Sequence, residues 1–233
     1  MKQSLLKIHL PKNSKQLFAA DFREMLAKAG DGSPLLPPAF FNYGEDGKPL
    51  SSVTPEIRIV GGKSWVGVLS MNHESQLFDA SVGIASRVAS NYYDMPLAIN
   101  VESKEFSVTR SDFPVVYYLR DMAIKRRTQK AQEKEIEELA KKRIENSLAQ
   151  IAERYGFNMP KPEQMQIVFH KSKNIGLHLK TRDSKSNEYV SLLNAEISMY
   201  LDLRGIWQVG NLPSRGYGRL IKQGGWNSGG GEE

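Results

Sequence analysis

The chain has 233 residues, of which 40% are hydrophobic and 25% charged, as in soluble globular proteins with one large core or two smaller ones. It contains no cysteine, which excludes disulfide bonds, thiolate metal sites and a thiol nucleophile. Its formal net charge of +6 favours a polyanionic partner.

The first part of the chain has the pattern of a strand followed by a helix. Residues 5–10 alternate apolar and polar side chains and predict a strand, with His9 on its polar face. Ser14 is a candidate N-cap for a helix over 15–29. An irregular, proline-rich stretch then runs from 34 to 55, a length typical of functional loops.

The next elements complete a ferredoxin-like domain. Residues 56–69 predict two strands joined by a hairpin turn at Gly61–Gly62. A helix over 75–90 and strand residues between 97 and 108 follow. Strand, helix, hairpin, helix and strand form the βαββαβ unit, and we place this domain at residues 1–111.

The remaining chain predicts a second α+β domain over residues 112–223. Its expected elements are a strand, a long helix, a hairpin, and then a strand or a helix: residues 113–119, 121–155, 164–180 and 189–203. We expect a disordered tail over 224–233. The predicted fold is therefore α+β, with two ferredoxin-like (RRM-like) units in tandem, the second of them irregular.

A glycine-rich loop begins at Gly205 and ends at Gly218. Its glycines permit positive φ and let the backbone approach a ligand without a Cβ in the way. No acidic residue occurs between Leu203 and Gly231, so backbone N–H groups and guanidinium groups here can bind phosphate oxygens. Trp207 and Tyr217 offer surfaces for base stacking. The alternative is a glycine-rich turn between two strands. The candidate RNA-binding residues are Arg204, Gly205, Gly210, Ser214, Arg215, Gly216, Tyr217, Gly218 and Arg219.

The start of the predicted long helix is strongly basic. Six basic residues lie between Arg120 and Lys134, against the two acids Asp121 and Glu133. On a helix several of them share one face, which can run along a nucleic-acid groove and neutralise phosphates. The alternative is an ordinary solvated helix surface. The candidate RNA-binding residues are Arg120, Lys125, Arg126, Arg127 and Lys130.

The chain has no pattern typical of a metal site. Its four histidines, His9, His73, His170 and His178, lack ligand-like spacing, and no carboxylate cluster suits Mg²⁺. We therefore expect neither a metal nor another cofactor. His9 can act as a general acid or base only if its sheet face lines a cleft.

Element order and the motif Gly205-x4-Gly210-x3-Ser-Arg-Gly-Tyr-Gly218 resemble the RAMP superfamily of CRISPR proteins. Within it the chain is most similar to the endoribonucleases that process precursor CRISPR RNA, in the arginine-using version found with type IV systems. The resemblance implies that the loop contacts the RNA backbone and that a basic helix, 120–130 here, enters the groove of a repeat hairpin. It also implies further CRISPR effector subunits as partners.

The departure from this family lies in the expected active site. Many such nucleases have a histidine in or after the first helix, whereas this chain has none between Lys12 and Asn72. Arg23 can stabilise charge that develops on a phosphorane. Tyr43 or His9 would then assist proton transfer. The alternative for Arg23 is an exposed helix residue paired with neighbouring acids.

These residues predict a metal-independent endoribonuclease that leaves a 2′,3′-cyclic phosphate and stays bound to its product. Two alternatives remain: a non-catalytic subunit that binds CRISPR RNA, and a generic RNA-binding protein. No apolar run approaches the roughly 18 residues that span a bilayer. The interrupted segment Met1–Pro11 is not typical of a signal peptide, so we expect a soluble, cytoplasmic protein.

Overall fold

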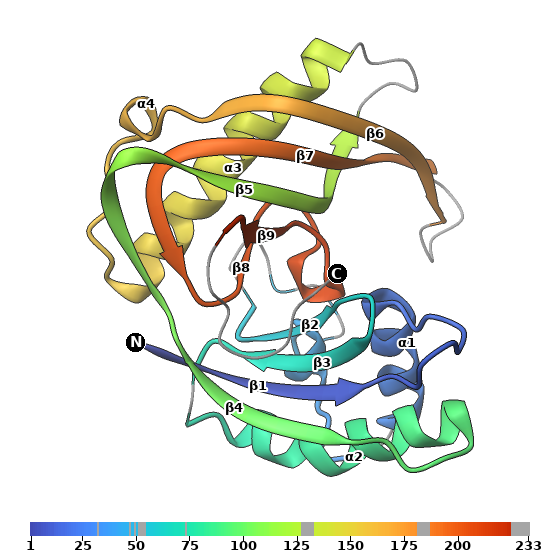
Figure 1. The fold of residues 1–233 in the computed structure, drawn as a ribbon. Helices are drawn as coiled ribbons and strands as arrows, with labels where there is room; N and C mark the ends of the chain where they lie inside the picture. Colours follow the sequence, from blue (N-terminus) through green and yellow to red (C-terminus); the bar gives the residue numbers. More distant parts are fainter. Residues whose placement is uncertain are drawn as a thin grey trace. The chain divides into compact units, whose positions relative to one another are not determined.

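The computed structural model describes residues 1–31, 33–46, 48, 50, 55–72, 74–126, 133–180 and 187–224. They form two compact units, coloured along the chain in Figure 1. Among the described residues, the first contains Met1–Phe106 together with Ser214–Gly216, and the second contains Ser107–Pro213 and residues 217–224. Within these ranges, no helix is long and apolar enough to cross a membrane.

The first unit is a four-stranded antiparallel sheet with two helices. Its sheet has the order β2-β3-β1-β4, which is the ferredoxin-like arrangement, and the predicted fold is confirmed. Its elements are β1 (Lys2–His9), α1 (Ala19–Ala29), the 3-10 helix η1 (Pro38–Phe41), β2 (Ile57–Gly61), β3 (Trp65–Ser70), α2 (Gln76–Tyr93) and β4 (Ile99–Glu105).

Both helices of this unit cover one face of its sheet. Leu6 and Ile8 of β1 are fully buried in one cluster with Phe22 and Leu26 of α1 and with residues of α2. Because side chains alternate along a strand, Lys7 and His9 point to the opposite face. The first strand and its polar face are therefore as predicted.

Two local predictions in this unit are wrong. Helix α1 begins at Ala19 rather than 15, because Leu17 is buried ahead of it, and the Ser14 hydroxyl donates to the Pro11 carbonyl (2.8 Å) instead of capping a helix. The hairpin turn is Lys63–Ser64 rather than Gly61–Gly62, since the Gly62 N–H donates to the Trp65 carbonyl (2.8 Å).

The second unit has a five-stranded antiparallel sheet with the order β6-β7-β5-β9-β8. Taking β5, β6, β7 and β9 in chain order, this is again the ferredoxin-like arrangement. The glycine-rich loop, with β8, stands in the chain where the second helix of the motif would be. The elements are β5 (Ser107–Arg126), α3 (Glu133–Tyr155), α4 (Pro162–Met165), β6 (Val168–Lys180), β7 (Asn187–Arg204), β8 (Trp207–Gln208), the 3-10 helix η2 (Pro213–Arg215) and β9 (Arg219–Lys222).

The predicted helix over 121–155 is wrong at its start. Residues up to Arg126 belong to β5, which pairs with β7 from Met122 to Arg126, and α3 is described from Glu133 onward. The cause is tertiary: Met122, Ala123 and Ile124 are all buried and pair with β7, whose sequence lies far away along the chain. Arg120, Lys125 and Arg126 are therefore strand residues.

The other elements of this unit largely follow the sequence. The apolar stripe of α3 is buried as expected, except for Leu139, which is 36% exposed. Residues 189–203 form a strand, β7. The hairpin predicted over 164–180 is wrong, because residues 171–174 continue through β6 in unbroken register with β7.

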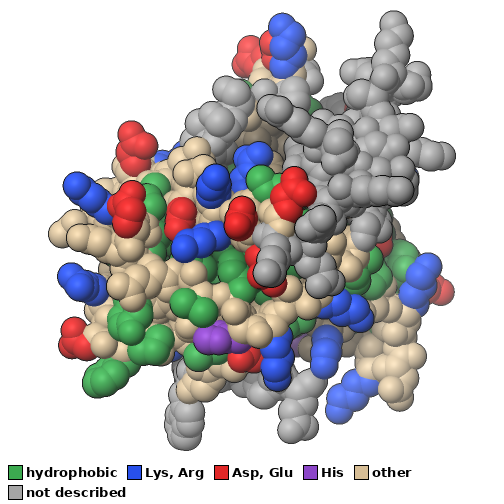
Figure 2. All heavy atoms as spheres, turned by 90° about the horizontal axis from the view of Figure 1, so that it is seen from above, with side chains coloured by type: hydrophobic (Ala, Val, Ile, Leu, Met, Phe, Trp, Pro, Cys, Tyr) green, Lys and Arg blue, Asp and Glu red, His purple; other side chains and the backbone are tan. Residues whose placement is uncertain are grey.

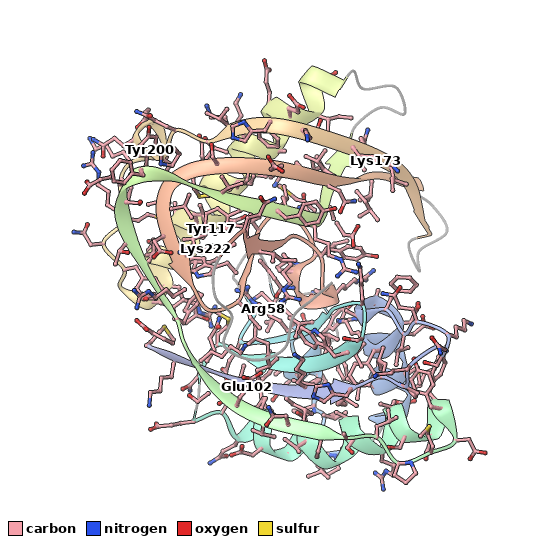
Figure 3. All side chains as sticks on the ribbon, viewed as in Figure 1. Arg58, Glu102, Tyr117, Lys173, Tyr200 and Lys222 are labelled. Carbon is pink, nitrogen blue, oxygen red and sulfur yellow. The ribbon has the colours of Figure 1, made fainter. Side chains whose placement is uncertain are left out.

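Tyr117 supports the ladder between β5 and β7. Its ring is 1% exposed, and its hydroxyl donates to the Leu201 carbonyl (2.8 Å) and accepts from the Leu203 N–H (2.9 Å) (Figure 3). Burial raises the pKa of Tyr117 well above its ordinary value. The folded state therefore favours the neutral phenol.

Tyr117→Phe is expected to lower the free energy of unfolding by about 1–3 kcal/mol, because the Leu203 N–H loses its buried acceptor. The stabilisation from neutral Tyr117 is present below about pH 10 and is lost as the pH rises above that value. Denaturant unfolding on both sides of pH 10 measures both effects, with the exposed Tyr92→Phe as control. Equal stability of Tyr117→Phe and the wild type would contradict this account.

Candidate active site and nucleic-acid interface

Arg23 and Tyr43, predicted as catalytic residues, lie together in the first unit. Arg23 projects from α1, and its Nη2 donates to the Phe41 carbonyl (2.8 Å). Its guanidinium carbon lies 5.4 Å from the Phe41 ring centroid and 5.9 Å from that of Tyr43. The short helix η1 produces this arrangement, because it ends at Asn42 in a left-handed conformation (φ 64°) and turns the chain back toward α1.

This arrangement fixes a permanent positive charge against two aromatic rings. All three side chains are half-buried, so the guanidinium lies in partly shielded surroundings. The neighbouring acid Glu24 forms an ion pair with Lys28 (3.0 Å). A held guanidinium can stabilise charge on phosphate oxygens without having to reorganise, but it is a poor proton carrier.

His9, the third predicted catalytic residue, does not join this pair. It ends β1, and its exposed side chain shares the sheet face of Lys7, opposite the face that α1 covers. The geometry therefore favours Tyr43 over His9 as the group that assists Arg23.

The glycine-rich loop does require glycine, but for a different reason from the one expected. Gly205, Gly210 and Gly216 have φ of 88° and Gly218 has φ of 75°. A Cβ on Gly218 would lie 1.7 Å from the Val209 carbonyl oxygen, and one on Gly216 would lie 2.4 Å from the Ala19 Cβ. The space that these glycines leave is filled by the protein itself, not kept open for RNA.

Several groups in the loop expected to contact RNA instead bind the protein. The Gly218 N–H donates to the Asp121 carbonyl (3.1 Å) and the Gly210 N–H donates to the Ser147 hydroxyl (2.9 Å), so neither is offered to a phosphate. Trp207 is 1% exposed, and its indole N–H donates to the Arg204 carbonyl (2.9 Å). Trp207 is therefore a core residue and not a base-stacking surface.

The side chains of the remaining loop candidates lie at the surface or are half-buried. Ser214, Arg215 and Tyr217 are half-buried, Arg204 is exposed, and Arg215 lies in the short helix η2. Their side chains, rather than the loop backbone, are the groups of this segment that can reach a phosphate.

A bulge in β5 lies directly after Arg120, one of the predicted RNA-binding arginines. The register with β7 shifts between Leu119 and Met122, and Asp121 takes a left-handed conformation (φ 49°). Asn194 of β7 holds the bulge: its Oδ1 accepts from the Asp121 N–H (3.0 Å), and its Nδ2 donates to Asp121 Oδ1 (3.1 Å).

Beside this bulge, Arg120 stands directly opposite Arg219 across the β5–β9 ladder. Two guanidinium groups at such positions can both donate to the oxygens of one phosphate. The Arg120 Nε also lies 3.5 Å from Asp121 Oδ2. Both arginines are RNA-binding candidates from the sequence, but no sequence pattern predicts that they lie side by side.

The helical RNA-binding face predicted from Arg120 to Lys130 is not formed as expected. Arg120, Lys125 and Arg126 lie on β5, while Arg127 and Lys130 are outside the described residues. On the face seen in Figure 2, Lys and Arg side chains are mixed with Asp and Glu.

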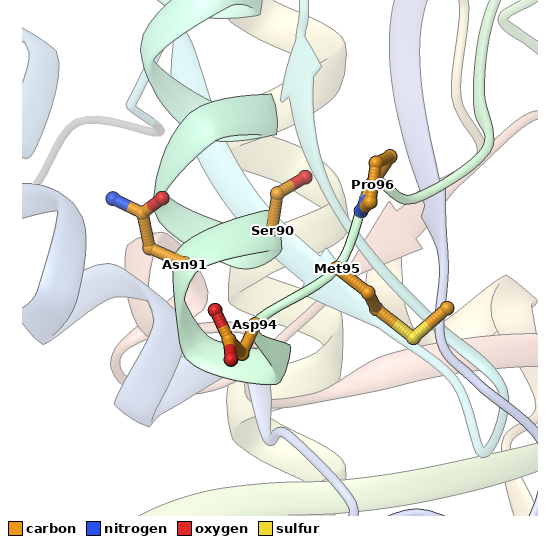
Figure 4. Close-up of a pocket in the computed structure, with 5 residues that line it drawn as sticks. All are labelled: Ser90, Asn91, Asp94, Met95 and Pro96. Carbon is orange, nitrogen blue, oxygen red and sulfur yellow. The ribbon is translucent and has the colours of Figure 1, made fainter.

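Neither a depression on α2 nor a metal cluster offers another site. The depression lies at the C-terminal end of α2 and is lined by Ser90, Asn91, Asp94, Met95 and Pro96 (Figure 4). That lining contains a carboxylate and no cation, which disfavours an RNA phosphate. Within the part of the chain that the structure describes, no group of three His, Asp or Glu residues could hold a metal ion.

The tandem ferredoxin-like fold is that of Cas6 proteins. Two solved structures described as Cas6b have TM-scores of 0.58 and 0.55, at 12% and 9% identity. In each comparison the match covers 95% of this chain and 100% of the other, and at this identity it shows the fold alone.

The family model of the type IV CRISPR-associated endonuclease Csf5 matches residues 1–225, and the chain belongs to this family. A solved structure described as "Csf5, CRISPR-Cas type IV Cas6 crRNA endonuclease" is 26% identical, with a TM-score of 0.82. The match covers 96% of this chain and 100% of that one. No curated protein sequence matches. The resemblance drawn from the sequence is thereby confirmed.

Proposed function

We propose that this protein binds CRISPR repeat hairpins and cleaves precursor RNA without a metal ion, remaining bound to the mature guide. The observation that carries the catalytic part is Arg23, whose guanidinium is held against Phe41 and Tyr43. Family membership supports RNA as the substrate. Further CRISPR effector subunits are the proposed protein partners.

The reaction is an internal transfer on the RNA backbone. The 2′-hydroxyl attacks the adjacent phosphorus, the bond from phosphorus to the 5′-oxygen breaks, and a 2′,3′-cyclic phosphate and a 5′-hydroxyl result. The proton of the 2′-hydroxyl is removed and one is delivered to the leaving oxygen, so the step needs no water. Arg23 stabilises the charge on the pentacovalent phosphorus, and the Tyr43 hydroxyl assists the proton transfer.

The hairpin is held by positive charge in the second unit and by the loop. Arg120 and Arg219, which stand opposite each other across β5 and β9, donate to the oxygens of one backbone phosphate. Arg204, Ser214, Arg215 and Tyr217 supply further contacts from the loop side chains.

A cleavage assay in EDTA tests the proposed chemistry. Purified protein is expected to cut its repeat RNA equally well in EDTA and in Mg²⁺, because Arg23 supplies the charge that a metal ion would otherwise supply. Repeat RNA with a 2′-deoxy group at the cut site is expected to bind with unchanged affinity and to resist cleavage. Cleavage only in Mg²⁺, or cutting of the deoxy substrate, would refute the mechanism.

A second candidate is a subunit that binds CRISPR RNA without cutting it. The same contacts favour it, because the bond from Arg23 to the Phe41 carbonyl also fastens the turn after η1 to α1. Under this candidate the wild-type protein would bind the repeat hairpin tightly and leave it intact in every buffer.

A further inference from the structure

The sheet of the second unit leaves one face uncovered by its long helix. On β7, Leu193, Ala195 and Ile197 are buried. Their neighbour on β6, Ser172, pairs with Ala195 and donates a hydrogen bond to Glu137 of α3, so this face is the one that α3 covers. Because side chains alternate, Lys171 and Lys173 point to the opposite, open face.

A tyrosine lies at the centre of this open face. Tyr118 of β5 is 39% exposed, and it stands between Glu196 of β7 and Ile221 of β9. Its hydroxyl is fixed by Asn194 Oδ1 (3.4 Å), so the ring is oriented while one surface stays accessible. By the alternation of β7, Tyr200 belongs to the same face, and Figure 3 places it toward the other end of the sheet from Lys173.

Basic groups surround Tyr118 on several strands. Lys171 and Lys173 are exposed on β6, while Arg120 and Arg219 face each other across β5 and β9. His170, at the bulge of β6, lies with its Nε2 2.9 Å from the Ser198 hydroxyl.

The acids of this face already have partners. Glu196 accepts from Gln223 Nε2 (3.2 Å), and Asp121 is bound by Asn194 and Arg120. Gln223 is neutral and leaves the charge of Glu196 in place, and Glu196 stands opposite Lys171 across β6 and β7. The four basic side chains Lys171, Lys173, Arg120 and Arg219 nevertheless outnumber the two acids Glu196 and Asp121. An exposed aromatic ring surrounded by cations on an open sheet is the arrangement with which ferredoxin-like domains bind single-stranded RNA, since the ring stacks on a base and the cations bind phosphates.

We propose that the open face of this sheet binds a single-stranded RNA segment that flanks the repeat hairpin, with one base stacked on Tyr118 and its backbone along Lys171 and Lys173. The inference rests on the proposed RNA substrate but concerns a different part of it. A hairpin supplies paired bases, which have no free surface to stack on a side chain, whereas an unpaired flank does. The site thus adds affinity for unprocessed or extended RNA beyond that of the hairpin alone.

The test compares RNAs with and without single-stranded extensions. Wild-type protein is expected to bind a hairpin carrying an extension of about eight nucleotides more tightly than the bare hairpin. Separate 5′ and 3′ extensions identify the flank, and an unlinked oligouridine shows whether the hairpin must be present. Tyr118→Ala is expected to weaken binding of the extended RNA by roughly ten-fold and to leave the bare hairpin unaffected.

Two matched variants separate stacking from charge. Tyr118→Phe keeps the ring and is expected to bind like the wild type. Lys173→Ala is expected to change how the binding constant for extended RNA depends on salt. The plot of log binding constant against log salt concentration should become shallower by about 0.7, the value for one phosphate contact on a single strand. Melting temperatures measured on the same preparations confirm that each variant is folded.

The proposal fails if extension adds no affinity to the wild type, if Tyr118→Ala leaves that added affinity intact, or if Tyr118→Ala weakens the bare hairpin equally. If the RNA extension adds no affinity and an acidic peptide binds this face instead, the face belongs to a protein partner. Cleavage of the bare hairpin in EDTA is scored separately. Loss of that cleavage would refute the proposed chemistry while leaving the result for the flank in place.

Discussion

Gly218→Ala is expected to lower the melting temperature by about 10 °C or more, which corresponds to roughly 3 kcal/mol for a chain of this size. The new Cβ would lie 1.7 Å from the Val209 carbonyl oxygen, so the backbone of the loop has to move. That movement breaks the hydrogen bond in which the Val209 N–H donates to the Gly218 carbonyl (2.8 Å). Thermal unfolding monitored by circular dichroism measures the effect.

Gly156→Ala is the matched control for this substitution. Gly156 also has positive φ (69°), but no atom lies within 4 Å of the position that its Cβ would take. It therefore reports backbone strain alone, about 1 kcal/mol. Equal melting temperatures of the two variants would mean that the loop relaxes around the new Cβ and that packing does not require Gly218. A loss of hairpin affinity in the folded Gly218→Ala protein would then show that the glycine serves a ligand.

Arg23→Ala is expected to slow cleavage of repeat RNA by a hundred-fold or more while hairpin affinity changes little. The reason is that a fixed charge near the reacting phosphate lowers the energy of the transition state more than that of the bound substrate. Single-turnover cleavage with excess enzyme measures the chemical step, and a filter-binding titration with 2′-deoxy RNA measures the affinity separately.

Arg23→Lys provides the comparison, since it keeps the charge but loses the planar group that rests on Phe41 and Tyr43. We expect an intermediate rate. Tyr43→Phe is expected to slow cleavage without affecting binding if its hydroxyl moves a proton. A wild-type rate in Arg23→Ala, with a lowered melting temperature, would mean that Arg23 only fastens the turn after η1.

The first unit could be predicted well because its pattern is local. Alternation in β1 and the spacing of buried residues in α2 are visible within a few residues, and the Ser75 hydroxyl caps α2 by accepting from the Phe78 N–H (3.3 Å). The sequence also predicts that Arg23 lies on a helix and Tyr43 in the loop after it. It does not predict the contact between their side chains, because that contact depends on the left-handed turn at Asn42.

The second unit could be predicted in its order of elements but not in their limits. The residues from Asp121 to Arg126 have no strong alternation, and only pairing with β7 makes them a strand. The opposition of Arg120 and Arg219 is a contact between distant parts of the chain that follows from the register of β5 and β9. The glycines of the loop are visible in the sequence, whereas the atoms that crowd them are not.

The replacement of a helix by a loop in the second unit determines where this protein can diversify. A helix tolerates exchange at every outward position, because its backbone geometry is the same from turn to turn. In this loop four glycines have positive φ, and two of them have N–H groups bonded to Asp121 and Ser147, so the backbone is constrained at these four positions. A lineage that adapts to a new repeat sequence would therefore exchange side chains between the glycines, such as Ser214 and Arg215, while the glycines themselves stayed unchanged.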